Sequence, residues 1–355
     1  LNDVGRLLLR EGVPSLPGPP WRQPARVQRL SDLADDAHWV QQKFVDTALE
    51  VEKVRYVADL PGKHQPVDAI PAEAMFRLDR LIASAREEVL LQTPYLIISD
   101  AAQTLIQELR EREVRPRLRV STNSLAATDN PIVYALSYKY KRRNLRQLGM
   151  EIHEYKPFPL DPPGGVRAGL EAVPDALYLP AARADTNLHG DLRRRQPGGG
   201  EVERDVLRTE TRPSFLGSGA VNRPLPVTRQ GARMGLHAKS LVIDRRIGVI
   251  GTHNFDPRSE NYNTEGMVVI ADERFARALA ASIERDMSPA NSWVVAPRQR
   301  MPVIGQFNYS LGKASEALPV LDLWPWRYAT VFEYVPSAQC PQPLSYRDRD
   351  FYACY

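Results

Sequence analysis

The sequence has few of the features that would place it in several large classes of protein. Its 355 residues include only two cysteines, Cys340 and Cys354, which indicates neither a disulfide framework nor a thiolate metal site. No apolar run approaches the roughly 18 residues of a transmembrane helix. The chain begins at Leu1 without a basic and then apolar leader, so we expect a piece of a longer protein whose targeting signal, if any, precedes it.

The chain also has little excess of either charge. Its 47 Lys and Arg residues against 43 Asp and Glu residues give a net charge of +4, too small to require nucleic acid as a partner. A hydrophobic fraction of 43% and a charged fraction of 25% are ordinary for a globular protein. Composition therefore predicts a globular chain and leaves its function to its motifs.

The first half of the chain shows a regular alternation of strand and helix patterns. We interpret residues 1–50 as a connecting arm and a helix from an upstream lobe. The strands and helices predicted after it are, in chain order, 53–59, 71–87, 88–98, 101–113, 117–123, 131–148 and 151–156. Because this strand–helix order is typical of sheets covered by helices, we expect an α/β fold with a mixed, largely parallel sheet flanked by helices.

The second half contains a long irregular insertion and then a compact group of strands. Residues 158–232 are rich in Pro, Gly and Arg, and a loop of this length is usually functional or disordered. Three strands are predicted at 236–244, 247–254 and 265–270, followed by a helix at 272–286. We therefore assign residues 51–295 to one lobe and residues 296–355 to a C-terminal extension.

One predicted strand, GLHAKSLVID, carries two titratable groups on the same face. His237 and Lys239 are two residues apart, and side chains alternate between the faces of a strand. Taken singly, each has a structural explanation, since a strand histidine is often a core group and a lysine can reach solvent at an edge. Asp244, before two arginines, is typical of a hairpin turn.

The combination resembles the signature of the phospholipase D superfamily. That signature reads H-x-K-x₄-D-x₆-G-[S/T]-x-N, followed eleven residues later by a carboxylate. The positions that match it in register are His237, Lys239, Asp244, Gly251, Thr252, Asn254 and Glu265. Segments such as QTPYLI (92–97) and VSTNSLAATDNP (120–131) further resemble the cardiolipin synthase-like branch of bacterial members.

The resemblance implies that a second copy of the signature is needed. Members of this branch carry two copies, whereas no other histidine of this chain has a lysine two positions on. We therefore interpret the chain as the C-terminal portion of a two-motif protein. Its expected partner is an upstream lobe carrying the first motif, or a second copy of the chain in a homodimer.

The resemblance also implies a role for each motif residue. In the family, one histidine attacks phosphorus and the other protonates the leaving oxygen, so His237 is predicted to be the general acid/base. Lys239, Asn254 and the Thr252 hydroxyl are predicted to bind the phosphate oxygens, and Glu265 to orient His237 by accepting from its second nitrogen. Asp244 is expected to hold the turn. No metal or other cofactor is implied, because lysine and asparagine supply the donors.

Three functions follow as hypotheses. The leading one is phosphodiester hydrolysis or phosphatidyl transfer on phospholipids, by a peripheral membrane, cytoplasmic or periplasmic protein of a bacterium. The apolar loop 95–98 and the basic helix 139–146 are the segments expected to face lipid headgroups or, for the helix, simply solvent. The alternatives are a nuclease of the same fold and a lobe that binds phosphate without catalysis. Hydrolysis and transfer share one phosphohistidine intermediate, so the sequence does not separate them.

Overall fold

The computed structural model describes most of the predicted lobe. It describes residues 24–51, 53–60, 73–124, 127–141, 143–156, 159, 161–162, 234–297, 329–332, 338, 340–344 and 348–350. Most of the predicted insertion and most of the C-terminal extension lie outside these residues. The chain divides into two compact units between Ala48 and Leu49. In the first unit, the helices are α2 (Pro24–Asp35), α3 (Ala37–Val40) and the π-helix η1 (Gln41–Val45).

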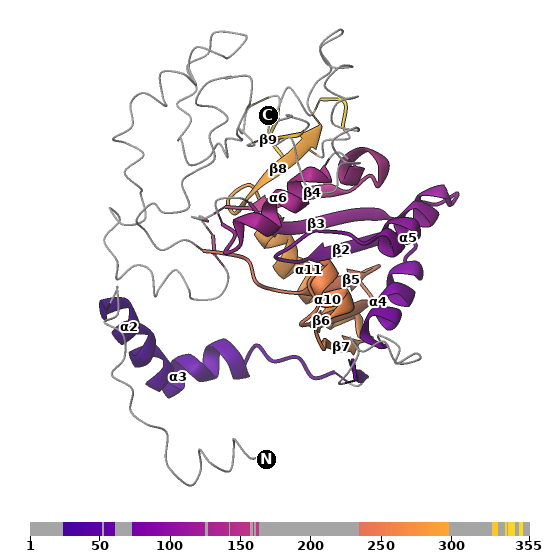
Figure 1. The fold of residues 1–355 in the computed structure, drawn as a ribbon. Coiled ribbons are helices and arrows are strands. Elements are labelled where there is room, and N and C mark those ends of the chain that lie inside the picture. Colours follow the sequence, from indigo (N-terminus) through magenta and orange to yellow (C-terminus); the bar gives the residue numbers. More distant parts are fainter. Residues whose placement is uncertain are drawn as a thin grey trace. The chain divides into compact units, whose positions relative to one another are not determined.

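The second unit is built on one mixed sheet (Figure 1). Its strands are β1 (Val54–Ala58), β2 (Glu88–Gln92), β3 (Arg117–Asn123), β4 (Glu151–Tyr155), β5 (Ser240–Ile243), β6 (Ile247–Gly251), β7 (Gly266–Ile270), β8 (Ser292–Pro297) and β9 (Ala329–Phe332). They lie in the order β1-β7-β6-β5-β2-β3-β4-β8-β9. The predicted α/β class with a mixed sheet is confirmed.

The prediction that the sheet is largely parallel is wrong. Among the described strands, only β2 with β3 and β3 with β4 pair in parallel, and the other six neighbouring pairs are antiparallel. A helical crossover carries the chain back between the parallel strands, whereas the turn 244–246 joins β5 directly to β6. So short a link allows only antiparallel pairing.

Helices cover both faces of the sheet around β2. The helices of this unit are α4 (Glu73–Ala83), α5 (Asp100–Glu111), α6 (Pro131–Lys139), the π-helix η2 (Arg143–Gln147), α10 (Pro257–Asn261) and α11 (Glu273–Met287). On one face, Leu90 of β2 packs with Val242 and with Ile283 of α11. On the other face, Val89 and Leu91 belong to the core that includes residues of α4, α5 and η2. Every residue of β2 is buried, as a strand covered on both faces requires.

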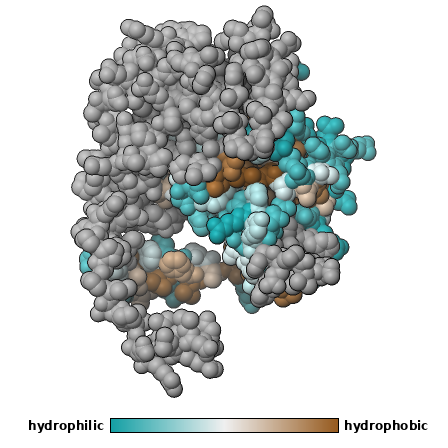
Figure 2. Space-filling view, in the orientation of Figure 1, coloured by the Kyte–Doolittle hydropathy of each residue, from teal (hydrophilic) through white to brown (hydrophobic). Residues whose placement is uncertain are grey.

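Sequence signals placed the helix ends well. Ser99, a predicted cap, accepts a hydrogen bond from the amide of Ala102 at the start of α5, at 3.2 Å. Gly149 adopts a φ of 64°, which ends the helical segment after η2 as predicted. The continuous helix expected over 131–148 is instead divided into α6 and η2. Figure 2 shows that hydrophilic residues dominate this view of the described surface, with an apolar patch between them.

Candidate active site

The segment that carries His237 is held in place by the end of β3. Asn123 accepts from the amide of Leu236 at 2.7 Å and donates to the carbonyl of Leu236 at 2.8 Å. The predicted strand 236–244 therefore begins only at Ser240, because a side chain takes the place of ladder partners. Next to these two hydrogen bonds, a Cβ at Gly235 would lie 2.8 Å from the carbonyl oxygen of Ala127. Only glycine therefore allows the two backbone segments to come this close. Sequence reasoning missed Asn123, whose only signal is its place at the end of a predicted strand.

The side chains of His237 and Lys239 lie together at the end of this segment. The ammonium of Lys239 is 3.0 Å from Nδ1 of His237, and it donates to the carbonyl oxygen of His237 at 2.8 Å. His237 is exposed and Lys239 is partly buried. Burial lowers the pKa of Lys239, against the opposing effect of the Glu265, Asp129 and Asp256 carboxylates. An exposed imidazole beside an ammonium can transfer a proton and bind an anion at one place.

The buried Glu265 and the exposed Thr252 form a hydrogen-bonded pair beside these residues. The Thr252 hydroxyl donates to Oε2 of Glu265 at 2.5 Å and accepts from the amide of Gly266 at 3.0 Å. The pairing of β6 with β7 places Thr252 beside Glu265, and a bond from His237 to this carboxylate stays a prediction. The Thr252 hydroxyl has one proton, so while it donates to Glu265 it does not donate to a phosphate.

A further carboxylate, which the sequence did not reveal, holds Glu265. Asp59 accepts from the amide of Glu265 at 3.1 Å and from the amide of Ala74 at 3.0 Å. Its own amide donates to the carbonyl of Glu265 at 2.8 Å. Asp59 and Glu265 are each 4% exposed. Asp59 thus ties the end of β1 and the start of α4 to the strand that carries Glu265.

Asn254 lies in a loop that is tied to its neighbours through the backbone. Its amide donates to the Ser259 hydroxyl at 3.2 Å, and its carbonyl accepts from the amide of Asp256 at 2.8 Å. Oδ1 of Asn254 is buried and has no hydrogen-bond partner within the described residues. Asp256 caps the start of α10 by accepting from the amides of Arg258 and Ser259. The loop therefore fixes the position of Asn254 and leaves its carboxamide oxygen without a bond.

The loop after β2 packs over the same end of the sheet. The amide of Ile97 donates to the carbonyl of Phe255 at 2.7 Å, and the Tyr95 hydroxyl donates to Asp129 at 2.8 Å. Burial, together with that carboxylate, raises the pKa of Tyr95 to about 12. Because residues 96–98 are buried, their predicted role in facing lipid headgroups is wrong.

The basic helix predicted over 139–146 is also not a simple surface feature. Lys141 is 2% exposed and pairs with Glu154, which accepts a hydrogen bond from the Tyr134 hydroxyl at 3.1 Å. The Lys141 ammonium lies 4.9 Å from the centroid of the Tyr134 ring. The buried part of this cluster therefore contributes to the core and is not available to an external anion.

Asp244 occupies the opposite end of β5 from His237 and has a structural role. It accepts from three successive backbone amides, at 3.0 Å from Arg86, 2.8 Å from Glu87 and 2.9 Å from Glu88. Its φ of 51° lies in the left-handed region, which aspartate tolerates better than most residues. The guanidinium of Arg245 forms ion pairs with Glu88 and Glu284. Asp244 therefore holds the turn through the backbone amides and not through Arg245.

Replacing Asp244 with alanine is expected to lower the free energy of unfolding by about 3 kcal/mol. The change removes charge-assisted hydrogen bonds to three amides. It also leaves alanine at a positive φ without the side-chain hydrogen bonds that offset the strain there. Urea denaturation followed by circular dichroism measures the loss. Asp35→Ala, at an exposed helix position, is the matched control and should change stability by less than about 0.5 kcal/mol. Equal stability of the two variants would contradict the role assigned to Asp244.

The motif residues therefore separate into two groups. His237, Lys239, Thr252 and Glu265 meet at the ends of β5, β6 and β7, and Asn254 follows directly in the adjoining loop. Asp244 lies at the other end of β5. Within the described residues, no group of three or more His, Cys, Asp or Glu side chains is arranged to hold a metal ion.

Comparisons with known proteins place this arrangement among related sequences. The family model described as "Cardiolipin synthase, PLD-like domain" matches residues 221–287. Cardiolipin synthase C of Escherichia coli is 24% identical over 261 residues, which cover 73% of this chain and 42% of that protein. The minor cardiolipin synthase ClsB of Bacillus subtilis is 49% identical over 51 residues, 14% of this chain and 13% of that protein. Two curated relatives match the chain over most of its length. In each of them the match covers about two fifths of the relative.

Among solved structures, the chain is similar to a phospholipase D family member, Nuc, from Salmonella typhimurium. It has a TM-score of 0.35 and 10% identity, and the match covers 67% of this chain and 95% of that one. NucT from Helicobacter pylori has a TM-score of 0.36 and 13% identity, with coverage of 68% and 98%. The family model contains every motif residue from His237 to Glu265. That match and the cardiolipin synthase relatives support the predicted assignment of the chain to the phospholipase D superfamily.

Proposed function

We propose that this chain supplies one half of an active site that cleaves or transfers phosphodiesters of phospholipids. The observation that carries the proposal is the contact between His237 and Lys239, at 3.0 Å, inside the segment matched by the family model. An imidazole transfers a proton at neutral pH, and an ammonium beside it stabilises the charge that develops on a phosphoryl oxygen. The two groups together can bind one phosphate and protonate its leaving oxygen.

The roles of the site residues follow from their surroundings. His237 is the general acid/base, and a histidine on a second motif is the nucleophile that forms the phosphohistidine. Lys239 and Asn254 donate to the non-bridging oxygens. The hydrogen bond from Thr252 to the buried Glu265 connects the end of β6 to the start of β7. The proton that leaves with the alcohol comes from His237, and the phosphorus–oxygen bond to that alcohol is broken as the bond to the second histidine forms.

The second motif comes from an upstream lobe, or from another copy of the chain. A single His237 faces only one side of phosphorus, while in-line displacement needs groups on both sides. The relatives are more than twice as long as the matched region, which leaves room in them for a preceding lobe. We favour the upstream lobe because the chain resembles the second half of a two-motif protein.

Phospholipid is the favoured substrate class for an electrostatic reason. Three carboxylates, Asp129, Asp256 and Glu265, act on Lys239. A negative surround of this kind opposes the approach of a nucleic acid backbone, which brings many phosphates, more than that of a single headgroup phosphate. Two of the relatives are cardiolipin synthases, which supports the same class. Within the described residues, no helix is long and apolar enough to cross a membrane. Because the favoured substrate is a membrane lipid, we propose that the protein acts peripherally at a bacterial membrane.

A competition between lipid and DNA tests the substrate class. The full-length protein that carries this chain is expected to release or exchange headgroups on phosphatidylglycerol vesicles, measured by mass spectrometry of the lipid products. Over the same period it should leave single- and double-stranded DNA uncut on gels. Asp129→Asn removes one carboxylate that acts on Lys239, and we expect it to raise DNA binding while the Asp35→Asn control does not. Efficient DNA cleavage without lipid turnover would establish the nuclease alternative instead.

A further inference from the structure

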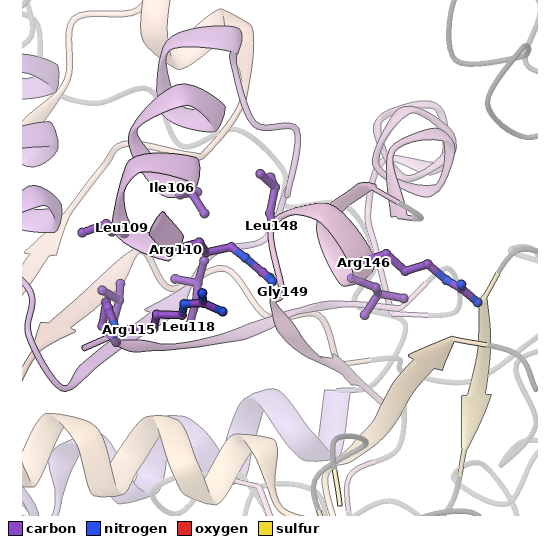
Figure 3. Close-up of a pocket in the computed structure, with 11 residues that line it drawn as sticks. Ile106, Leu109, Arg110, Arg115, Leu118, Arg146, Leu148 and Gly149 are labelled. Atoms are coloured by element: carbon purple, nitrogen blue, oxygen red, sulfur yellow. The ribbon is translucent and has the colours of Figure 1, made fainter. Parts of the chain in front are cut away.

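A cavity lies near the start of β2 and β3, at the end of these strands opposite the candidate active site. It has a volume of about 340 Å³, at the lower end of the range for small-molecule sites. Val89 of β2 and Leu118 of β3 line it, together with Ile106 and Leu109 of α5 and Leu148 after η2 (Figure 3). Val89 is four residues before Thr93, so roughly 13 Å of strand separates the hollow from the active-site end. The hollow is therefore distinct from the phosphate site.

The walls of this cavity are apolar, and its edge carries positive charge. The apolar lining residues belong to the core on the face of the sheet that α5 covers. Arg110 and Arg115 also line the cavity, and Figure 3 shows both near its apolar side chains, whereas Arg146 extends away. Arg115 is exposed and forms no ion pair within the described residues.

Other arginines close by are used within the fold, which makes Arg115 the distinctive one. Arg112 donates to the carbonyls of Ala83 and Ala85, at 2.8 and 2.9 Å. Arg117 pairs with Glu151 at 3.2 Å. Arg115 lies between them in the sequence and remains at the edge of the cavity. A guanidinium next to an apolar hollow provides charge complementarity for an anion that carries a hydrocarbon chain.

We propose that this cavity binds a single-chain amphiphile with an anionic head, either a carboxylate or a phosphate. The chain would lie against Val89, Ile106 and Leu148, and the head would accept hydrogen bonds from Arg115 at the edge. The volume admits one chain and excludes a two-chain phospholipid, and the apolar walls disfavour small hydrophilic anions. The proposal does not rest on the proposed function, because it uses no residue of the phosphate site.

Binding is tested on the complete 355-residue chain by isothermal titration calorimetry, with ligands held below their micelle concentrations. The probes are decanoate, decyl phosphate, decanol and decyltrimethylammonium. Both anions are expected to bind saturably at one site, and the neutral and cationic probes at least about tenfold more weakly. Preference between decanoate and decyl phosphate distinguishes a fatty acid from a lysophospholipid as the natural source. No saturable binding of either anion, or equal binding of the cation, would overturn the proposal.

Two variants connect the binding to the cavity. Arg115→Ala is expected to weaken anion binding about tenfold, and the matched control Arg86→Ala, also an exposed arginine, should leave it unchanged. Ile106→Trp fills the cavity and should abolish binding of all four probes, provided that thermal unfolding shows a folded chain. If Arg115→Ala and Arg86→Ala bind decanoate equally, the assignment of Arg115 is wrong whatever the behaviour of the tryptophan variant.

Discussion

Replacing His237 with alanine in the full-length protein is expected to lower phosphodiester turnover by about a thousandfold. General acid–base catalysis typically contributes two to four orders of magnitude, and the change removes the group that protonates the leaving oxygen. The imidazole is exposed, and within the described part of the chain its ring has a polar contact with Lys239 alone, so its loss leaves no buried group there unpaired. Headgroup release from phosphatidylglycerol vesicles measures the rate, and circular dichroism checks the fold.

The matched control is His38→Ala, at an exposed position of α3 and outside the candidate site. It should retain the wild-type rate. A substrate whose leaving group needs no proton, such as a p-nitrophenyl phosphodiester, sharpens the experiment. His237→Ala should lose much less activity on this substrate if His237 acts as the acid. An equal loss on both substrates would point to His237 as the nucleophile, and a near-wild-type rate on both would remove it from the mechanism.

The 355-residue chain by itself is expected to show no turnover of phosphodiesters. Phosphoryl transfer through a phosphohistidine needs histidines on both sides of phosphorus, and the sequence carries a single copy of the motif. Supplying the lobe with the first motif, as a separate chain or as a fusion, should restore activity. Headgroup release is measured on each preparation, and light scattering reports the mass of the species that is active.

The control for this reconstitution is a first lobe whose motif histidine is replaced by alanine. It should bind the chain without restoring turnover. Activity of the chain alone as a dimer would show that a second copy supplies the missing histidine. Activity of a monomer of these 355 residues that depends on His237 would refute the half-site proposal.

Local sequence patterns predicted much of the fold because they depend on near neighbours. The strand at β3 is found at 117–123 as predicted, and Ser99 and Gly149 mark helix ends by capping and by positive φ. The spacing of the motif also predicted that His237 and Lys239 lie together, because side chains two positions apart in an extended segment point to the same face.

The amino-acid sequence by itself determined which chemical groups this protein presents, and the tertiary structure decided what each group contacts. Glu265 accepts a hydrogen bond from Thr252, and Asp244 accepts from amides more than 150 residues earlier in the chain. Lys141, read as part of a basic surface, is buried against Glu154. Asn123, which carries no motif, clamps the backbone before His237. Propensity and spacing report on residues within a few positions of one another, whereas these partners are set by strand pairing and by the packing of segments far apart in the chain.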